Sequence, residues 1–191
     1  MHYFTRTRFS TILLLMLLAA CSDTPVPFRS TVIPEVKWGK NFSLTSQQGT
    51  TFDTATLHGK VQVIFFGFTH CPDICTPTLT KLAQVNKALG DERPQVQVVF
   101  VTVDPQHDTP RQLASFLAGI DASFIGLTGS PEQLKAVAQD HKIYAEGAGG
   151  MFTHSGNLLV KDRSGRVRLV IAESASVEDI VHDLRLLLTQ K

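Results

Sequence analysis

Hydrophobic positions along this chain fall into continuous runs and into runs with a helical period. Residues 61–68 and 96–103 are almost wholly apolar, and a shorter apolar stretch covers 124–127. Such runs are typical of strands buried on both faces of a parallel sheet. Each run is followed by apolar residues spaced three and four positions apart, which predicts helices over about 72–89, from 110 onward and over about 131–141.

Two hairpins and a last helix complete the pattern. Residues 38–44 and 50–52 flank a Gln48-Gly49 turn, and residues 157–161 and 167–172 flank a compact turn at 162–165. Ser176 is placed to cap a final amphipathic helix. Strand–helix–strand–helix followed by hairpin–helix is the order of a thioredoxin-like α/β fold. We therefore expect a central mixed sheet flanked by helices, with an N-terminal β-hairpin and no second domain.

The first 20 residues have the pattern of an export signal. Arg6 and Arg8 precede an apolar stretch over 12–18, which is shorter than the roughly 20 apolar residues of a membrane-spanning helix. The small residues before Cys21 resemble a bacterial lipoprotein cleavage box, which implies removal of 1–20 and lipidation of Cys21. The alternative is an uncleaved anchor in which this cysteine occurs by chance.

Behind this signal the composition changes twice. Residues 21–36 contain several prolines and small polar residues, and we interpret them as a lipidated tether for a domain over 37–191. That domain would be anchored to a membrane through Cys21 and face the periplasm. The 18 Lys and Arg residues nearly balance the 17 Asp and Glu residues, and no basic run occurs, so we expect no binding of nucleic acid. We also expect the protein to be a monomer.

The remaining two cysteines directly follow the first apolar run. If Pro72 is the first helical residue, Cys71 lies at the helix N-terminus and Cys75 lies one turn later on the same face. The partial positive charge of a helix N-terminus favours a thiolate at Cys71. Two thiolates on one turn can form a disulfide or bind one soft metal ion, and both possibilities stay open at this point.

Three ordered motifs carry a family resemblance. They are the stretch 66–75 that contains the cysteine pair, the loop with Val103-Asp104-Pro105 and Asp108-Thr109-Pro110, and His154-Ser155-Gly156. Together they resemble the Sco/SenC family of thioredoxin-like, membrane-tethered copper chaperones that serve cytochrome c oxidase assembly. The resemblance implies copper, as Cu(I) or Cu(II), as the bound metal and a cytochrome c oxidase subunit or another cuproprotein as the recipient.

The resemblance also implies site residues. Cys71, Cys75 and His154 match the copper ligands, and Asp73 matches an acidic position of the motif beside them. Thr153 departs from the family, which commonly has an acidic residue there. Independently of the family, soft thiolates select Cu(I), and an added imidazole makes a site that can also hold Cu(II).

Other histidines and acids are expected to have structural roles. We expect Asp104 and Asp108 to cap and shape their loop, and we expect His141, near a helix C-terminus, to favour the cationic form. We do not expect metal ligation by Met151 or by the histidines at 58, 70, 107, 141 and 182.

Two further functions are alternatives to copper delivery. A thiol–disulfide reductase would cycle Cys71 and Cys75 between dithiol and disulfide, acting on cysteines of an oxidase or another exported protein. The three-residue spacer and the absence of a proline over 151–156 argue against a general catalyst of this enzyme class. A peroxiredoxin-type peroxidase is disfavoured because the stretch 68–72 lacks the Thr-x-x-Cys spacing.

Overall fold

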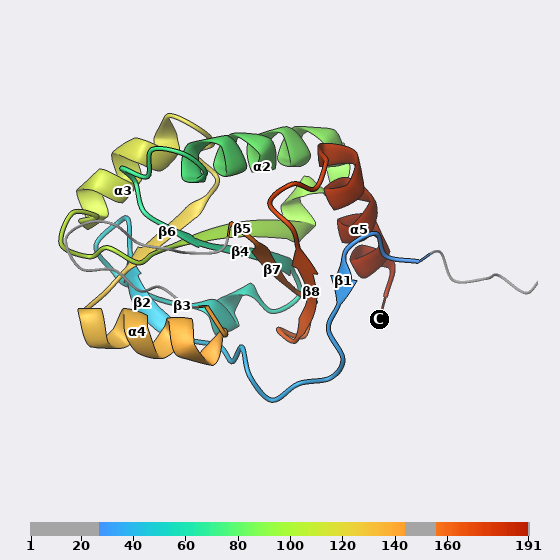
Figure 1. The fold of residues 1–191 in the computed structure, drawn as a ribbon, viewed down its shortest axis with the longest axis horizontal. Helices are drawn as coiled ribbons and strands as arrows, with labels where there is room; N and C mark the ends of the chain where they lie inside the picture. Colours follow the sequence, from blue (N-terminus) through green and yellow to red (C-terminus); the bar gives the residue numbers. More distant parts are fainter. Residues whose placement is uncertain (1–26, 144–155, 191) are drawn as a thin grey trace, which may run out of the picture.

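The computed structural model describes residues 27–143 and 156–190 of the chain. Its strands form one eight-stranded sheet in the order β1-β8-β7-β4-β5-β6-β2-β3 (Figure 1). Strands β4, β5 and β6 run parallel and the other pairings are antiparallel, so the sheet is mixed as predicted. The strands are β1 Thr31–Val32, β2 Ser43–Ser46, β3 Thr51–Asp53, β4 Val61–Gly67, β5 Val96–Thr102, β6 Ile125–Thr128, β7 Leu158–Lys161 and β8 Val167–Ile171.

Within the described residues, four α-helices cover the two faces of this sheet. Helices α2, α3 and α5 pack on one face, and α4 packs on the other (Figure 1). Their bounds are α2 Cys75–Leu89, α3 Pro110–Ala118, α4 Pro131–Asp140 and α5 Val177–Thr189, and short 3₁₀ helices cover Thr54–Leu57 and Gly90–Gln95. The chain therefore has the α/β, thioredoxin-like architecture expected from its pattern.

Strand β4 lies at the centre of the core, and every one of its residues is buried. Its side chains alternate between the two faces, as the pleat of a strand requires. Phe65 packs in the cluster beneath α2, α3 and α5, whereas Phe66 packs in the cluster beneath α4. The carboxyl end of β4 pairs with that of β5, Gly67 opposite Thr102, so the loops that follow both strands start side by side.

The predicted cap at Ser176 is confirmed, and two further helices are capped in the same way. The side chains of Thr109, Ser130 and Ser176 accept hydrogen bonds from backbone amides three residues later, at the starts of α3, α4 and α5. Gly90 ends α2 with a φ of 55°, a conformation that glycine adopts without strain. The N-terminal hairpin turns at Gly49 as predicted, although its first strand lies at 43–46 and not over 38–44.

The predicted start of α2 at Pro72 is wrong. The helix begins at Cys75, and the amide of Thr78 donates the first helical bond, to the carbonyl of Ile74. Pro77 explains the shift, because a helix from Pro72 would place this residue in the helix interior, where its missing N–H breaks a bond. With the start at Cys75, Pro77 falls in the first turn, where amides have no partner within the helix.

Part of the predicted tether is packed against the domain. Thr31 and Val32 pair with β8, which adds β1 to the edge of the sheet. The backbone amides of Arg29 and Ser30 donate to the two carboxylate oxygens of Asp183, at 2.8 and 2.9 Å. Because Asp183 is fully buried on α5, these bonds fix residues 29–32 to the body of the fold.

The expected cationic character of His141 is also wrong. The ring is fully buried, and burial together with the charge of Lys161 lowers the pKa of His141 to about 4. The Nδ1–H of the neutral ring donates to the carbonyl of Val137 at 2.9 Å, and the ring packs edge-on against Phe42. The sequence places this histidine at a helix end but does not show that the end is buried.

Candidate metal centre

The cysteine pair spans the junction between β4 and α2. After Gly67 the chain turns, with the amide of Cys71 donating to the carbonyl of Phe68 at 3.3 Å, and α2 begins at Cys75. Both cysteines are present as thiols, Cys71 half-buried and Cys75 fully buried. The pair therefore presents one sulfur near the surface and one sulfur behind it.

Gly67 makes room for the inner sulfur. A Cβ added to this glycine would lie 2.8 Å from Cys75 Sγ and 2.9 Å from Cε2 of Phe100, both far inside normal contact distance. The sulfur of Cys75 thus packs directly on the backbone of the last residue of β4. Any side chain at position 67 would displace it.

The surroundings shift the pKa values of the two thiols in opposite directions. Burial acts to raise the pKa of Cys71, but hydrogen bonds from the backbone at 73, 74 and 75 and from the Cys75 side chain outweigh it, so this pKa is lowered. Burial raises the pKa of Cys75 far above its usual range, and the charges of Cys71 and Asp108 add to that effect. The outer sulfur is therefore the more readily ionised, and the two side chains are in hydrogen-bond contact.

Asp108 holds the cysteine loop against the neighbouring loop. Its buried carboxylate accepts the backbone amide of Thr69 at 3.0 Å and the hydroxyl of Thr69 at 2.6 Å. The hydroxyl of Thr102, at the end of β5, donates to the same carboxylate at 2.6 Å. Asp108 shapes the loop as predicted, and it also fixes the residues just before the cysteine pair.

The third predicted ligand, His154, lies outside the described residues, as do Met151 and Thr153. The chain is described again from Gly156. A Cβ added to Gly156 would lie 3.2 Å from Cδ1 of Ile74, the residue before Cys75, and 2.8 Å from Cγ of Glu173. Gly156, the last residue of the predicted His154-Ser155-Gly156 motif, therefore packs against the residue before Cys75.

The remaining predicted site residues are placed as follows. Asp73 is exposed between the cysteines, and it is its backbone that bonds to Cys71. Cys21 and the proposed signal over 1–20 lie outside the described residues. Within 27–143 and 156–190, no helix has the length and apolar character needed to cross a membrane.

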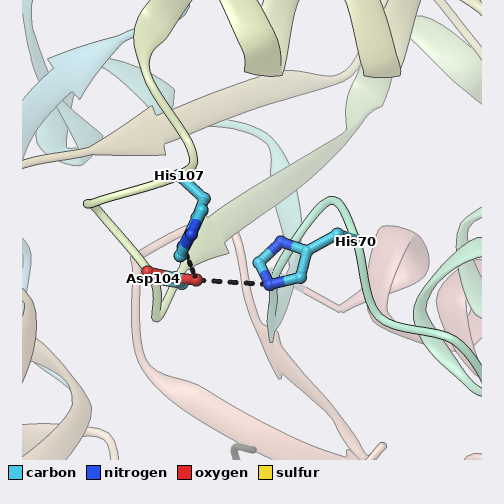
Figure 2. A group of neighbouring side chains, drawn as sticks. All are labelled: His70, Asp104 and His107. Atoms are coloured by element: carbon cyan, nitrogen blue, oxygen red, sulfur yellow. Dashed lines mark hydrogen bonds and ion pairs between the residues drawn. The ribbon is translucent and has the colours of Figure 1, made fainter. Parts of the chain in front are cut away.

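One feature of the site was missed from the sequence. His70 and His107, for which no metal ligation was expected, converge on the carboxylate of Asp104 (Figure 2). A signal was present, because His70 follows β4 and Asp104 follows β5, and the carboxyl ends of adjacent parallel strands meet at one edge of a sheet. The sequence did not show that these two strands are neighbours.

Two adjacent sulfurs of unequal exposure can bind one soft metal ion or close to a disulfide. The partly exposed Cys71 gives an incoming ion or thiol access, and Cys75 holds a fixed position behind it. A nitrogen ligand would have to come from a different segment, and Gly156 brings such a segment to the start of α2.

Comparison with known proteins agrees with this arrangement. An SCO2-like protein of Rickettsia felis is 33% identical over 157 residues, which cover 78% of this chain and 77% of that protein. The structure of Bradyrhizobium japonicum ScoI with copper bound is 33% identical and superposes with a TM-score of 0.70, covering 78% of this chain and 98% of that chain.

A third similarity establishes the fold. BsSco, a protein with an identified disulfide switch and a member of the Sco family of cytochrome c oxidase assembly proteins, is 24% identical. Its structure superposes with a TM-score of 0.71 and covers 85% of this chain and 98% of that chain.

The SCO1/SenC family model matches residues 31–189, nearly all of the described domain. This chain belongs to the SCO1/SenC family.

Proposed function

We propose that this protein carries copper on Cys71, Cys75 and His154 and delivers it to a copper protein, the copper site of cytochrome c oxidase. The observation that carries the proposal is the pair of contacting thiols at the start of α2, one partly exposed and one buried. Thiolates are the ligands that Cu(I) prefers, and a partly exposed thiolate permits ligand exchange with a recipient protein. Related proteins support it, one solved with copper bound and one described as an oxidase assembly protein.

The connection at Gly156 supports His154 as the third ligand. His154 is two positions before Gly156 in the sequence, and Gly156 packs against Ile74, the residue before Cys75. Two sulfurs and one nitrogen form a site that holds both oxidation states of copper.

His154→Ala tests this ligand set. The variant is expected to lose Cu(II) affinity by at least about tenfold while the Cys71/Cys75 reduction potential changes little, because the imidazole is no part of the dithiol couple. The control is His58→Gln, which removes an exposed imidazole that lies beside Gly165. Unchanged Cu(II) affinity in His154→Ala would contradict the three-ligand assignment.

We also propose that Cys21 is lipidated and that the domain faces the periplasm. Residues 29–32 are fixed to α5 and β8, and they follow Cys21 closely in the sequence. A lipid on Cys21 would thus hold the domain close to the membrane surface. Cys21→Ser should move the protein from the membrane fraction to the soluble periplasmic fraction, and retention in the membrane would contradict the anchor.

A thiol–disulfide reductase is the second candidate, and the unequal thiols favour it. The Cys71 thiolate would attack a target disulfide and form a mixed disulfide. Cys75 would then give up its proton, attack Cys71 Sγ and release the reduced target, which leaves this protein as the disulfide. Stoichiometric reduction of an oxidised copper-binding peptide by the copper-free dithiol, lost in Cys75→Ser, would support this role.

A further inference from the structure

A second cluster of metal-binding side chains lies beside the cysteine pair. The Oδ2 atom of Asp104 lies 2.7 Å from His107 Nδ1 and 3.4 Å from His70 Nε2 (Figure 2). The two imidazole rings lie side by side, with centroids 4.9 Å apart and planes inclined at 58°. The Asp104 side chain is 5% exposed, whereas the His70 and His107 side chains are 44% and 63% exposed. The carboxylate is therefore buried, and the two imidazoles are open to solvent.

The backbone that carries these three residues is held in place. Asp108, the residue after His107, accepts two hydrogen bonds from Thr69, the residue before His70. The amide of Asp108 donates to the carbonyl of Asp104 at 2.9 Å, and the amide of Asp104 donates to the Thr102 hydroxyl at 3.0 Å. The loops after β4 and β5 are thus joined on both sides of the cluster, and only the rings have to move when a ligand enters.

The geometry suits one metal ion. One ligand atom from each of the three residues lies within 4.8 Å of the others. Around an ion with bonds of about 2.1 Å, adjacent ligand atoms are about 3–3.5 Å apart, a spacing that small rotations of two exposed rings can reach. Two imidazole nitrogens and one carboxylate oxygen form a borderline donor set, unlike the soft sulfurs of the cysteine pair.

We propose that His70, Asp104 and His107 form a second metal site that takes Cu(II). Among first-row divalent ions, Cu(II) binds most tightly to a nitrogen and oxygen donor set. The site is open to solvent and lies one residue from Cys71 along the chain, so the protein has a borderline site next to a soft one. The proposal goes beyond copper carriage by the cysteines and does not depend on it, because it uses none of the three ligands assigned to that function.

The test removes the first site and counts copper at the second. In the full chain carrying Cys71→Ser, Cys75→Ser and His154→Ala, we expect one Cu(II) ion per protein, with an electron paramagnetic resonance spectrum split by two nitrogens. In the same background, His70→Gln or His107→Gln should each weaken Cu(II) at least about tenfold and leave splitting from one nitrogen, because each removes a ligand. His58→Gln, which changes an exposed histidine elsewhere, should leave both the affinity and the spectrum unchanged.

The deciding variants are the two exposed histidines, which can be changed without opening the core. Asp104→Asn alters a buried group, and circular dichroism would establish whether that variant folds before its affinity is compared. Absence of a Cu(II) ion in the triple variant would overturn the proposal. Copper retained with the same affinity after His70→Gln and His107→Gln would also overturn it, since the ion would then lie elsewhere. The same experiment tests the cysteine site separately. If that site binds no copper, the unmodified chain and the triple variant should bind the same number of copper ions per protein.

Discussion

The carboxylate of Asp108 accepts both the backbone amide and the side-chain hydroxyl of Thr69, a residue 39 positions earlier in the chain. This double contact fixes the turn that leads to Cys71. Because it also joins the loops after β4 and β5, it supports the cysteine pair and the His70–Asp104–His107 cluster at once.

Asp108→Asn should loosen both sites. The carboxylate accepts three hydrogen bonds, and the NH₂ group of asparagine would face at least one of these donors. We expect a loss of about 1–3 kcal/mol in the free energy of unfolding, together with weaker copper binding, measured by urea denaturation and copper titration. Asp91→Asn, at an exposed carboxylate beyond the far end of α2, is the control and should change neither quantity. Equal stability of Asp108→Asn and the unmodified protein would contradict a stabilising role of the three hydrogen bonds to Asp108.

Gly67→Ala should displace the inner sulfur. The new methyl group would lie 2.8 Å from Cys75 Sγ and 2.9 Å from the ring of Phe100 in a fully buried strand. Overpacking of this kind costs about 1–3 kcal/mol, and copper affinity should fall with it. Gly119→Ala is a matched control, because Gly119 has a φ of −73° and its added Cβ would meet only ordinary contacts. If both variants unfold at the same urea concentration, the packing of Cys75 on Gly67 is not as described.

Alkylation should distinguish the two thiols. Cys71 is half-buried and Cys75 is fully buried, so iodoacetamide should modify Cys71 first in the folded, copper-free protein. Peptide mass spectrometry at successive times measures the order. In urea both cysteines should react at similar rates, which serves as the control. Modification of Cys75 first, or at the same rate in the folded state, would contradict the inner and outer positions.

Stability should fall in mild acid because His141 is buried in its neutral form. The folded protein takes up this proton only near pH 4 and the unfolded chain near pH 6.5, so the unfolded state binds more protons within that window. The free energy of unfolding should therefore fall by about 2 kcal/mol from pH 7.5 to pH 5. Lys161, whose pKa burial lowers to about 8, changes its contribution only at higher pH.

His141→Phe isolates this effect. Phenylalanine keeps a ring against Phe42 and Phe66 but cannot take up a proton. Urea denaturation at pH 7.5 and pH 5 should show a smaller pH dependence in the variant than in the unmodified protein. The same pH dependence in both would show that His141 does not titrate as described.

Much of the fold could be predicted from local pattern. The continuous apolar run of β4 indicated a strand buried on both faces, and Ser176 indicated where the last helix, α5, begins. Local pattern also placed Cys71 and Cys75 at the strand–helix junction. The error at the start of α2 arose from Pro72, although Pro77 indicated the correct start.

The contacts between loops could not be predicted in the same way. The hydrogen bond from Thr69 to Asp108 and the ion-pair contact of His70 with Asp104 both require β4 and β5 to be parallel neighbours. That is a property of the whole sheet. The neutral state of His141 depends on its burial among residues from distant segments. Hydrophobic period and spacing report which face of an element is buried, and they carry little information on which polar groups meet.

The most direct measurement of the central claim is a Cu(II) titration of the reduced protein followed by absorbance. A thiolate-to-copper charge-transfer band should grow to saturation at one equivalent, and it should be lost in Cys71→Ser and in His154→Ala. His70→Gln should leave this band in place, because the imidazole of His70 contacts Asp104. Oxidation of the thiols to a disulfide, with no copper retained and no charge-transfer band, would contradict copper carriage and favour the reductase.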